Sequence, residues 1–219
     1  IVKHETEYDV SDAYQYNPDL RAHIEAQIAN YADELAYNAH DLDDGLRSGI
    51  IAPSILEQLN LWNIARDSIN WDGIQLSELN RHRMIRRIIG LQIHDIIETT
   101  NSNIQKLNPT DPFDIQRLDY NVVKWSEQYT KFNPEINAFL RNNLFSHPRV
   151  KAMENKAIKI LGDLYHHLVN NPNHLPSTIQ QTVKTLGIER AVCDYIAGMT
   201  DRFAVAEHMK LEPNSTYPV

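Results

Sequence analysis

Helical periodicity is the feature that most constrains what this chain can fold into. Apolar residues recur every three or four positions in almost every long window, and the alternation typical of half-buried strands is not sustained. Between residues 20 and 46 they mark one face of a long helix: Ile24, Ile28, Tyr31, Leu35, Ala39, Leu42 and Leu46. The sequence therefore predicts an all-α protein, folded as an irregular helical bundle.

Proline, glycine and asparagine divide this pattern into segments. Residues 1–19 have no clear periodicity and end at Asn17-Pro18, so we expect an extended lead-in followed by a long helix over 20–48. Further helices are expected at 53–68, 77–100, 134–145, 149–170 and 177–209, the last with a break near Gly187. Without a repeat or a Gly/Ser linker, we expect one domain over 1–219, with the bundle at 49–209 and a tail at 210–219.

Composition narrows the classes of partner. A net charge of −8 argues against a broad nucleic-acid surface, because neutralising phosphates needs clustered Lys and Arg. No apolar run approaches the roughly 20 residues that span a bilayer, so we expect no membrane partner. The single cysteine, Cys193, cannot form an intramolecular disulfide, and no charged-then-apolar leader opens the sequence. Both observations favour the cytoplasm, with Cys193 expected in the core.

The long helix at 20–48 carries a polar face opposite its apolar stripe. At about 100° per residue, Asp33, Tyr37 and Asp44 fall within about 40° of one another, with His40 and Asp41 beside them. A solvated surface explains most of this pattern. However, the acidic side chains lie in the second half of the helix, where the macrodipole disfavours anions. We therefore expect a positive group close by, either a metal ion or an arginine from another element.

Four segments of the chain resemble one known family. The runs 25–47 and 190–202 resemble hallmark segments of the bacterial dGTPase-like dNTP triphosphohydrolases, which are HD-domain phosphohydrolases, and 83–91 and 139–150 fit in the same order. The resemblance covers essentially the whole chain and implies the all-α, C-terminal part of such an enzyme. It also implies cleavage of a dNTP, with dGTP favoured, to deoxynucleoside and triphosphate. A divalent metal, Mg²⁺ or Mn²⁺, and a homo-oligomer are implied too.

The resemblance assigns roles on the polar face. The last metal ligand of the family motif falls on Asp33, while Tyr37 and Asp41 match positions that contact substrate. Their spacing is physically reasonable, because groups at i, i+4 and i+8 of a helix lie on nearly the same side. Asp33 is thus predicted to bind the metal, and Tyr37 and Asp41 to bind the nucleotide.

A second group of predicted substrate contacts lies in the run 139–150. Arg141, His147 and Arg149 are candidate donors to the triphosphate, since arginine suits phosphate oxygens, although an interhelical ion pair explains each arginine equally well. At Phe145-Ser146 the family commonly has a Tyr-Arg pair. This departure puts the substrate contacts of that segment in question.

The family's other metal ligands, a His and a His-Asp pair, precede the region that Ile1 matches, so the sequence assigns no catalytic residue. We expect this chain to be inactive without them. Two alternatives stay open. Phe145-Ser146 suggests a non-catalytic helical module for oligomerisation or nucleotide sensing. A self-contained metal site could also be assembled from His4, His40-Asp41 and a later carboxylate such as Asp95 of His94-Asp95.

Overall fold

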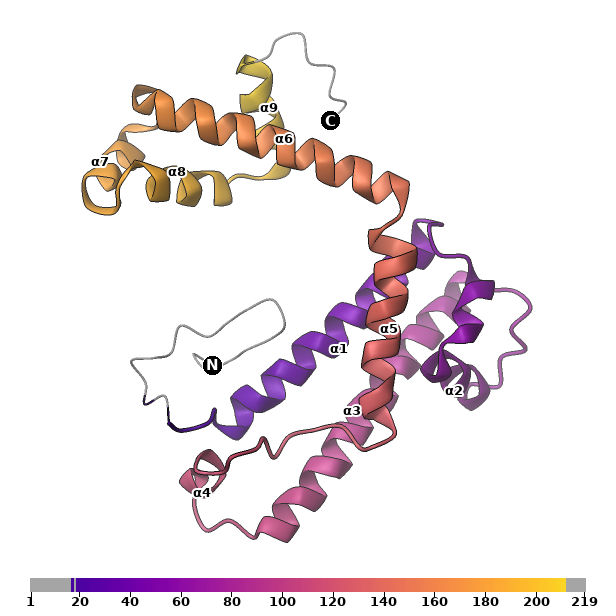
Figure 1. Cartoon of the computed structure of the whole chain (residues 1–219). Helices are drawn as coiled ribbons and strands as arrows, with labels where there is room; N and C mark the ends of the chain where they lie inside the picture. The colour runs from indigo at the N-terminus through magenta and orange to yellow at the C-terminus, as the bar shows by residue number, and fades with distance from the viewer. Residues whose placement is uncertain (1–16, 18, 212–219) are drawn as a thin grey trace. The chain divides into compact units, whose positions relative to one another are not determined.

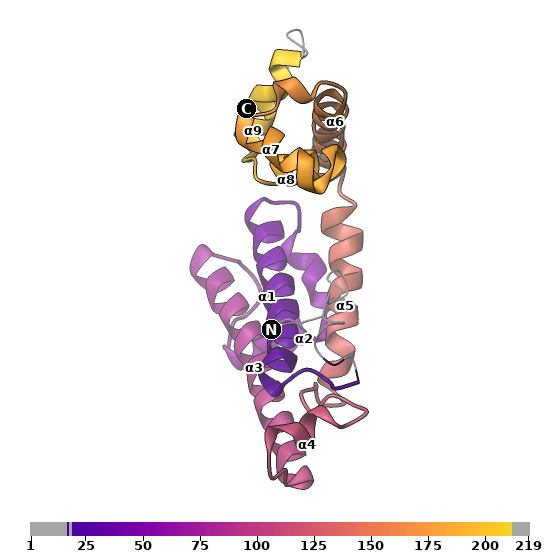
Figure 2. The ribbon, with the colours of Figure 1, turned by 90° about the vertical axis from the view of Figure 1, so that its left-hand side faces the viewer.

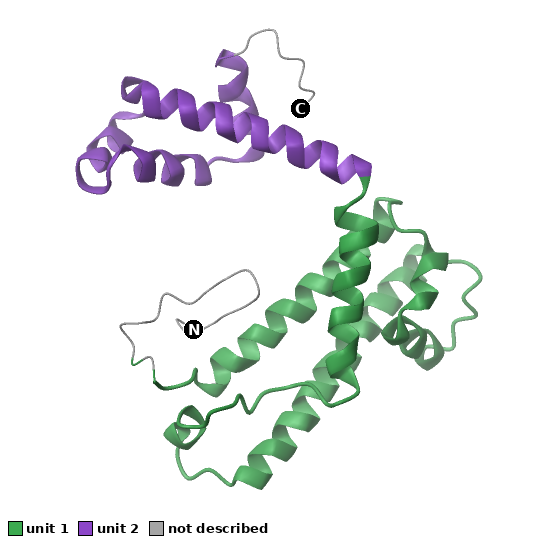
Figure 3. Ribbon diagram, in the orientation of Figure 1, with its two compact units in different colours: residues 1–147 green, residues 148–219 purple. Residues whose placement is uncertain are grey.

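The computed structural model describes Asn17 and residues 19–211, and these residues form helices joined by turns, with no strand among them. Chain contacts divide the protein into two compact units, Ile1–His147 and Pro148–Val219 (Figure 3). The expected all-α fold is confirmed. Whether the two units act as the one domain expected from the sequence stays a prediction.

Three long helices position everything else in the first unit. α1 (Ile24–Arg47) lies beside both α3 (Glu78–Leu107) and α5 (Phe132–Leu140), as two perpendicular views show (Figures 1 and 2). Shorter elements connect them: a 3-10 helix at Pro53–Gln58, α2 (Asn60–Ser68), α4 (Pro112–Gln116) and a 3-10 turn at Tyr129–Lys131. A π-helical turn at Arg141–Phe145 follows α5.

The core of the first unit is assembled from faces of these helices. Its most deeply buried side chains include Trp62 of α2, Met84 of α3 and Ile136 of α5, each at most 2 % exposed. From α1, the predicted apolar positions Leu35, Ala39 and Leu42 are buried, as expected. Ile28 departs from the prediction because it is 44 % exposed. Near the start of α1 the buried positions are Ala26 and Gln27 instead.

The side chain of Gln27 fixes the start of α1. Its Oε1 accepts hydrogen bonds from the backbone N–H groups of Val122 (2.9 Å) and Val123 (3.2 Å), and its Nε2 donates to the carbonyl of Ala22 (2.9 Å). Buried backbone donors need such partners, because an unpaired one costs free energy. The amide of Gln27 therefore ties the start of α1 to the segment that precedes α5.

The second unit is built on one long helix. α6 (Pro148–Asn170) is followed by a 3-10 turn at Pro172–His174, α7 (Ser177–Leu186), α8 (Ile188–Ala197) and α9 (Asp201–Leu211). Two small apolar clusters hold it together, one around Leu164 and one around Leu168. Cys193 on α8 is exposed, so the expectation that it lies in the core is wrong. No helix among the described residues is long and apolar enough to cross a membrane.

Candidate functional site

The outer face of α1 carries the residues predicted to bind metal and nucleotide. Asp33 and Tyr37 are exposed there, with Tyr37 at 51 %, and Asp41 is half-buried. They lie on the side away from Leu35, Ala39 and Leu42 because apolar and polar positions are offset around the helix. The first unit therefore presents these three groups together, one helical turn apart, on a rigid element.

Asp41 has the most perturbed environment on this face. Burial raises the pKa of its carboxyl, the neighbouring Asp44 carboxylate raises the pKa further, and His40 opposes both effects. Its Oδ2 atom is buried and has no hydrogen-bond partner, and the same is true of Nδ2 of Asn38, a side chain 2 % exposed. Buried polar groups normally find partners, although other buried atoms, among them Oε1 of Gln92 and Nδ2 of Asn133, also lack one.

Asn38 was not among the residues predicted from the sequence. It sits between Tyr37 and Ala39, at the border of the polar and apolar faces, where periodicity alone gives an asparagine no particular role. Its burial depends on α3 and α5, which pack against this helix. The burial of Asn38 could be predicted from the sequence only if the packing of these helices were already known.

The positive group expected near the acidic half of α1 is in part an arginine from another element. Arg81 of α3 forms an ion pair with Asp43, and the Arg81 side chain is almost completely buried. This pair accounts for one of the acidic side chains on α1. It leaves Asp33 and Asp41 on a different side of the helix from the ion pair.

The aromatic ring of Tyr37 has a neighbour from the predicted substrate segment. The rings of Tyr37 and Phe145 lie 6.5 Å apart, centroid to centroid, and are tilted by 46°. Phe145 belongs to the π-helical turn Arg141–Phe145, and Ser146 donates its hydroxyl to the carbonyl of Arg141 (2.6 Å). The departure from the family's Tyr-Arg pair therefore lies directly beside Tyr37.

The predicted triphosphate donors fall in both units. Arg141 begins the π-helical turn and is exposed, and His147 is half-buried at the end of the first unit. Arg149 is exposed in the first turn of α6, in the second unit. Arg141 thus shares an element with Phe145, whereas a common site for all three donors stays a prediction.

The alternative metal site receives little support from the residues that can be placed. Asp95 accepts a hydrogen bond from the backbone N–H of Ser126 (2.9 Å), which gives it a structural role, and His40 is exposed. His4 lies outside the described residues. Over Asn17 and residues 19–211, no group of three His, Cys, Asp or Glu side chains is arranged to hold a metal ion. Asp33 by itself offers one carboxylate to such an ion.

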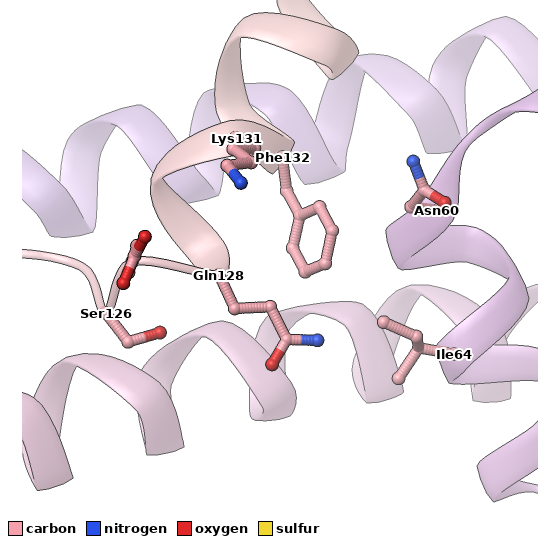
Figure 4. A pocket seen from close by; sticks show the side chains of 7 residues that line it. Asn60, Ile64, Ser126, Gln128, Lys131 and Phe132 are labelled. Carbon is pink, nitrogen blue, oxygen red and sulfur yellow. The ribbon is translucent and has the colours of Figure 1, made fainter.

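A separate pocket of about 650 Å³ opens between α2 and the segment that leads into α5 (Figure 4). The Phe132 ring projects into it, Ile64 and Asn60 form the opposite side, and Ser126, Gln128 and Lys131 line the rest. None of the predicted site residues borders this space.

The chain is similar in sequence to a family of known proteins. The profile of the phosphohydrolase-associated domain family matches residues 123–210. Three curated relatives are each named deoxyguanosinetriphosphate triphosphohydrolase-like protein. Those of Geobacter metallireducens and Geobacter sulfurreducens are 41% and 39% identical over 96% of this chain and 56% of their own length. That of Bartonella quintana is 33% identical over 91% of this chain and 52% of its own length. The chain spans about half the length of these relatives.

Proposed function

Because the chain belongs to the family of the deoxyguanosinetriphosphate triphosphohydrolase-like proteins, we propose that it forms part of the active site of such a hydrolase. The reaction is the cleavage of a dNTP, with dGTP favoured, to the deoxynucleoside and triphosphate. The remaining metal ligands would come from the part of the relatives' length that this chain does not span. On this proposal the 219 residues alone are inactive.

The observation that carries this proposal is the outer face of α1. Asp33, Tyr37 and Asp41 lie together there, and the side chains of Asp33 and Tyr37 are exposed. The buried Oδ2 of Asp41 and Nδ2 of Asn38 have no partners, which costs stability. A binding site is one place where proteins keep unpaired polar groups.

Each side chain has a role suited to its chemistry. The Asp33 carboxylate would be one oxygen ligand of a hard divalent cation, Mg²⁺ or Mn²⁺. When bound, such an ion polarises a phosphoryl oxygen and lowers the pKa of a bound water. Tyr37 would position the nucleotide, and its ring is supported by Phe145. Asp41, with its raised pKa, is able to hold a proton more readily than an ordinary aspartate and so to donate a hydrogen bond.

Arg141, His147 and Arg149 would donate to the triphosphate as its negative charge develops. Charge-assisted hydrogen bonds from guanidinium groups are about twice as strong as neutral ones, and are often bidentate. Arg141 is the best placed of the three, because it shares a helical turn with Phe145, which contacts Tyr37. We also expect the complete protein to be cytoplasmic and to form a homo-oligomer. Light scattering would measure its oligomeric state.

One observation favours a second candidate. Phe145 and Ser146 replace a hydroxyl and a cation of the family pattern at the point that touches Tyr37, and the Ser146 hydroxyl is used within its own turn. A protein altered there could bind a nucleotide without cleaving it. This alternative is a helical module for nucleotide sensing or oligomerisation.

Activity with and without the rest of the protein separates these functions. The 219-residue chain is assayed with dGTP and Mg²⁺ or Mn²⁺, alone and fused to the part of the Geobacter metallireducens relative that it does not span. The proposal expects deoxyguanosine and triphosphate from the fusion and neither product from the chain alone. Strong turnover by the chain alone contradicts it. Tight dGTP binding without triphosphate release by the fusion supports the sensing module instead.

A further inference from the structure

Two histidines in the second unit are in direct contact, away from the outer face of α1. His167 lies in the last turn of α6, and His174 ends the 3-10 turn that follows. Nε2 of His167 and Nδ1 of His174 are 2.8 Å apart, and the ring centroids are 4.9 Å apart. We propose that this pair binds a divalent transition metal ion of the Zn²⁺, Ni²⁺ or Cu²⁺ class.

The distance between the two nitrogens suits a shared ion. Zinc binds histidine nitrogen at about 2.0–2.1 Å, so two nitrogens on one ion lie roughly 2.9–3.4 Å apart for angles between 90° and tetrahedral. The observed separation of 2.8 Å is slightly below that range, and rotation of the rings would bring the two nitrogens to the required distance. Imidazole is a ligand that suits zinc, nickel and copper. In the metal-free pair, one nitrogen donates a hydrogen bond to the other.

The turn between the histidines fixes the backbone that carries both rings. The backbone N–H and the side-chain Nδ2 of Asn171 each donate to the carbonyl of His167, at 2.9 Å. The backbone N–H of His174 donates to the carbonyl of Asn171 (2.9 Å), and Leu175 is buried directly afterwards. An ion would therefore meet ligands on a backbone that is already ordered, which reduces the entropic cost of binding.

The electrostatic surroundings also favour a cation. The C-terminal turn of a helix carries partial negative charge from unsatisfied carbonyl groups, and His167 stands in that turn of α6. Both histidines border a pocket of about 550 Å³ that Glu207 and Lys210 also line, and these two residues form an ion pair with each other. His174 is exposed, so an ion reaches the pair from solvent.

The ion would have two protein ligands. Since the described part of the chain has no group of three His, Cys, Asp or Glu side chains arranged around a metal, water would fill the other positions. A two-imidazole site selects against Mg²⁺, which prefers oxygen ligands in octahedral geometry. This site is therefore distinct in chemistry from the carboxylate at Asp33, and either could fail without the other.

Calorimetry with the metal alone tests the proposal. The 219-residue chain, with the exposed Cys193 replaced by Ser to remove a competing thiol, is titrated with ZnCl₂ and separately with MgCl₂. We expect Zn²⁺ to bind, and His167→Gln or His174→Gln to weaken binding at least about tenfold, as losing a ligand should cost no less than losing a supporting residue. His166→Gln, an exposed neighbour, is the matched control and should leave the affinity unchanged.

Histidine NMR spectra of the chain with only Cys193→Ser make the test independent of folding in the variants. Zn²⁺ should shift the ring signals of His167 and His174 and leave those of His166 in place. Absence of Zn²⁺ binding, or equal affinity after either glutamine substitution, overturns the site. Asp33→Asn should leave Zn²⁺ binding unchanged, so this result is separable from the outcome of the dGTP assay.

Discussion

Along α1, most of the buried side chains are apolar, with Gln27 and Asn38 the polar exceptions, whereas the opposite side carries Asp33, Tyr37 and Asp41. The first set needs no explanation beyond the fold, because burying apolar surface stabilises the protein. The second set includes a carboxyl group whose pKa is raised by burial and a buried oxygen without a partner. The same helix thus gains stability on one face and gives some up on the other, which is the pattern expected of a functional surface.

The largest effect should come from the buried face. Leu42 is 1 % exposed in the main core, so Leu42→Ala should lower the free energy of unfolding by about 2–5 kcal/mol, through lost burial and the cavity left behind. Urea denaturation measures this loss. Ile28→Ala on the same helix is the matched control, and its effect should be much smaller because Ile28 is 44 % exposed. Equal losses at both positions would break the contrast between the faces.

The close approach at the end of α1 should have the next largest effect. A Cβ on Gly45 would overlap Cδ1 of the buried Ile51 and lie 2.8 Å from its Cγ1. Overpacking of this kind costs about 1–3 kcal/mol, which exceeds the helix-propensity gain of about 1 kcal/mol for Gly→Ala. Gly45→Ala should therefore destabilise the protein in thermal unfolding.

Two companion variants sharpen that measurement. Ile51→Val removes the overlapping Cδ1 atom and should recover part of the loss when combined with Gly45→Ala. Gly90→Ala on α3 has open space around its Cβ and should raise stability by up to about 1 kcal/mol. If Gly45→Ala were as well tolerated as Gly90→Ala, the packing argument for the end of α1 would be wrong.

On the outer face of α1, a substitution should raise the free energy of unfolding instead of lowering it. The folded state raises the pKa of Asp41, so the ionised carboxylate lowers stability, and this penalty grows as the pH rises through the folded pKa. Asp41→Asn removes the charge and should raise the free energy of unfolding slightly near pH 7, by up to about 0.5 kcal/mol. The difference from the unaltered protein should shrink in acid, below the unfolded pKa, where the carboxyl is protonated in both states. A gain that was larger in acid would contradict this assignment.

Local patterns in the sequence predict most of the helices, and the deviations have physical causes. α3 runs past the expected end at Thr100 to Leu107 and ends where Asn108 adopts a left-handed conformation with φ 47°. Asn103, in this extension, donates to the carbonyl of Val122 and so ties it to a distant segment. The segment expected at 53–68 splits at Leu59, which is extended. The break at Gly187 is confirmed, and a second break follows Ala197.

The candidate site is less accessible to sequence reasoning than the helices. The shared side of Asp33 and Tyr37 follows from 100° per residue, since it is a property of one helix. The contact between Tyr37 and Phe145, the burial of Asn38 and the pairing of Asp43 with Arg81 all join distant segments. Such contacts depend on how the helices pack, which no local pattern encodes. The role of Asp33 as a metal ligand rests on the family resemblance and stays a prediction.

Asp33→Asn in the completed protein tests the central claim most directly. The fusion with the Geobacter metallireducens segment is titrated with Mn²⁺, and both metal binding and dGTP turnover are followed. We expect turnover to fall at least about 100-fold and Mn²⁺ binding to weaken, with a change in stability within about 0.5 kcal/mol. Asp44→Asn, an exposed carboxylate on the same side of α1, is the matched control and should leave both nearly unchanged. Equal Mn²⁺ affinity and turnover in the D33N and D44N variants would contradict the account.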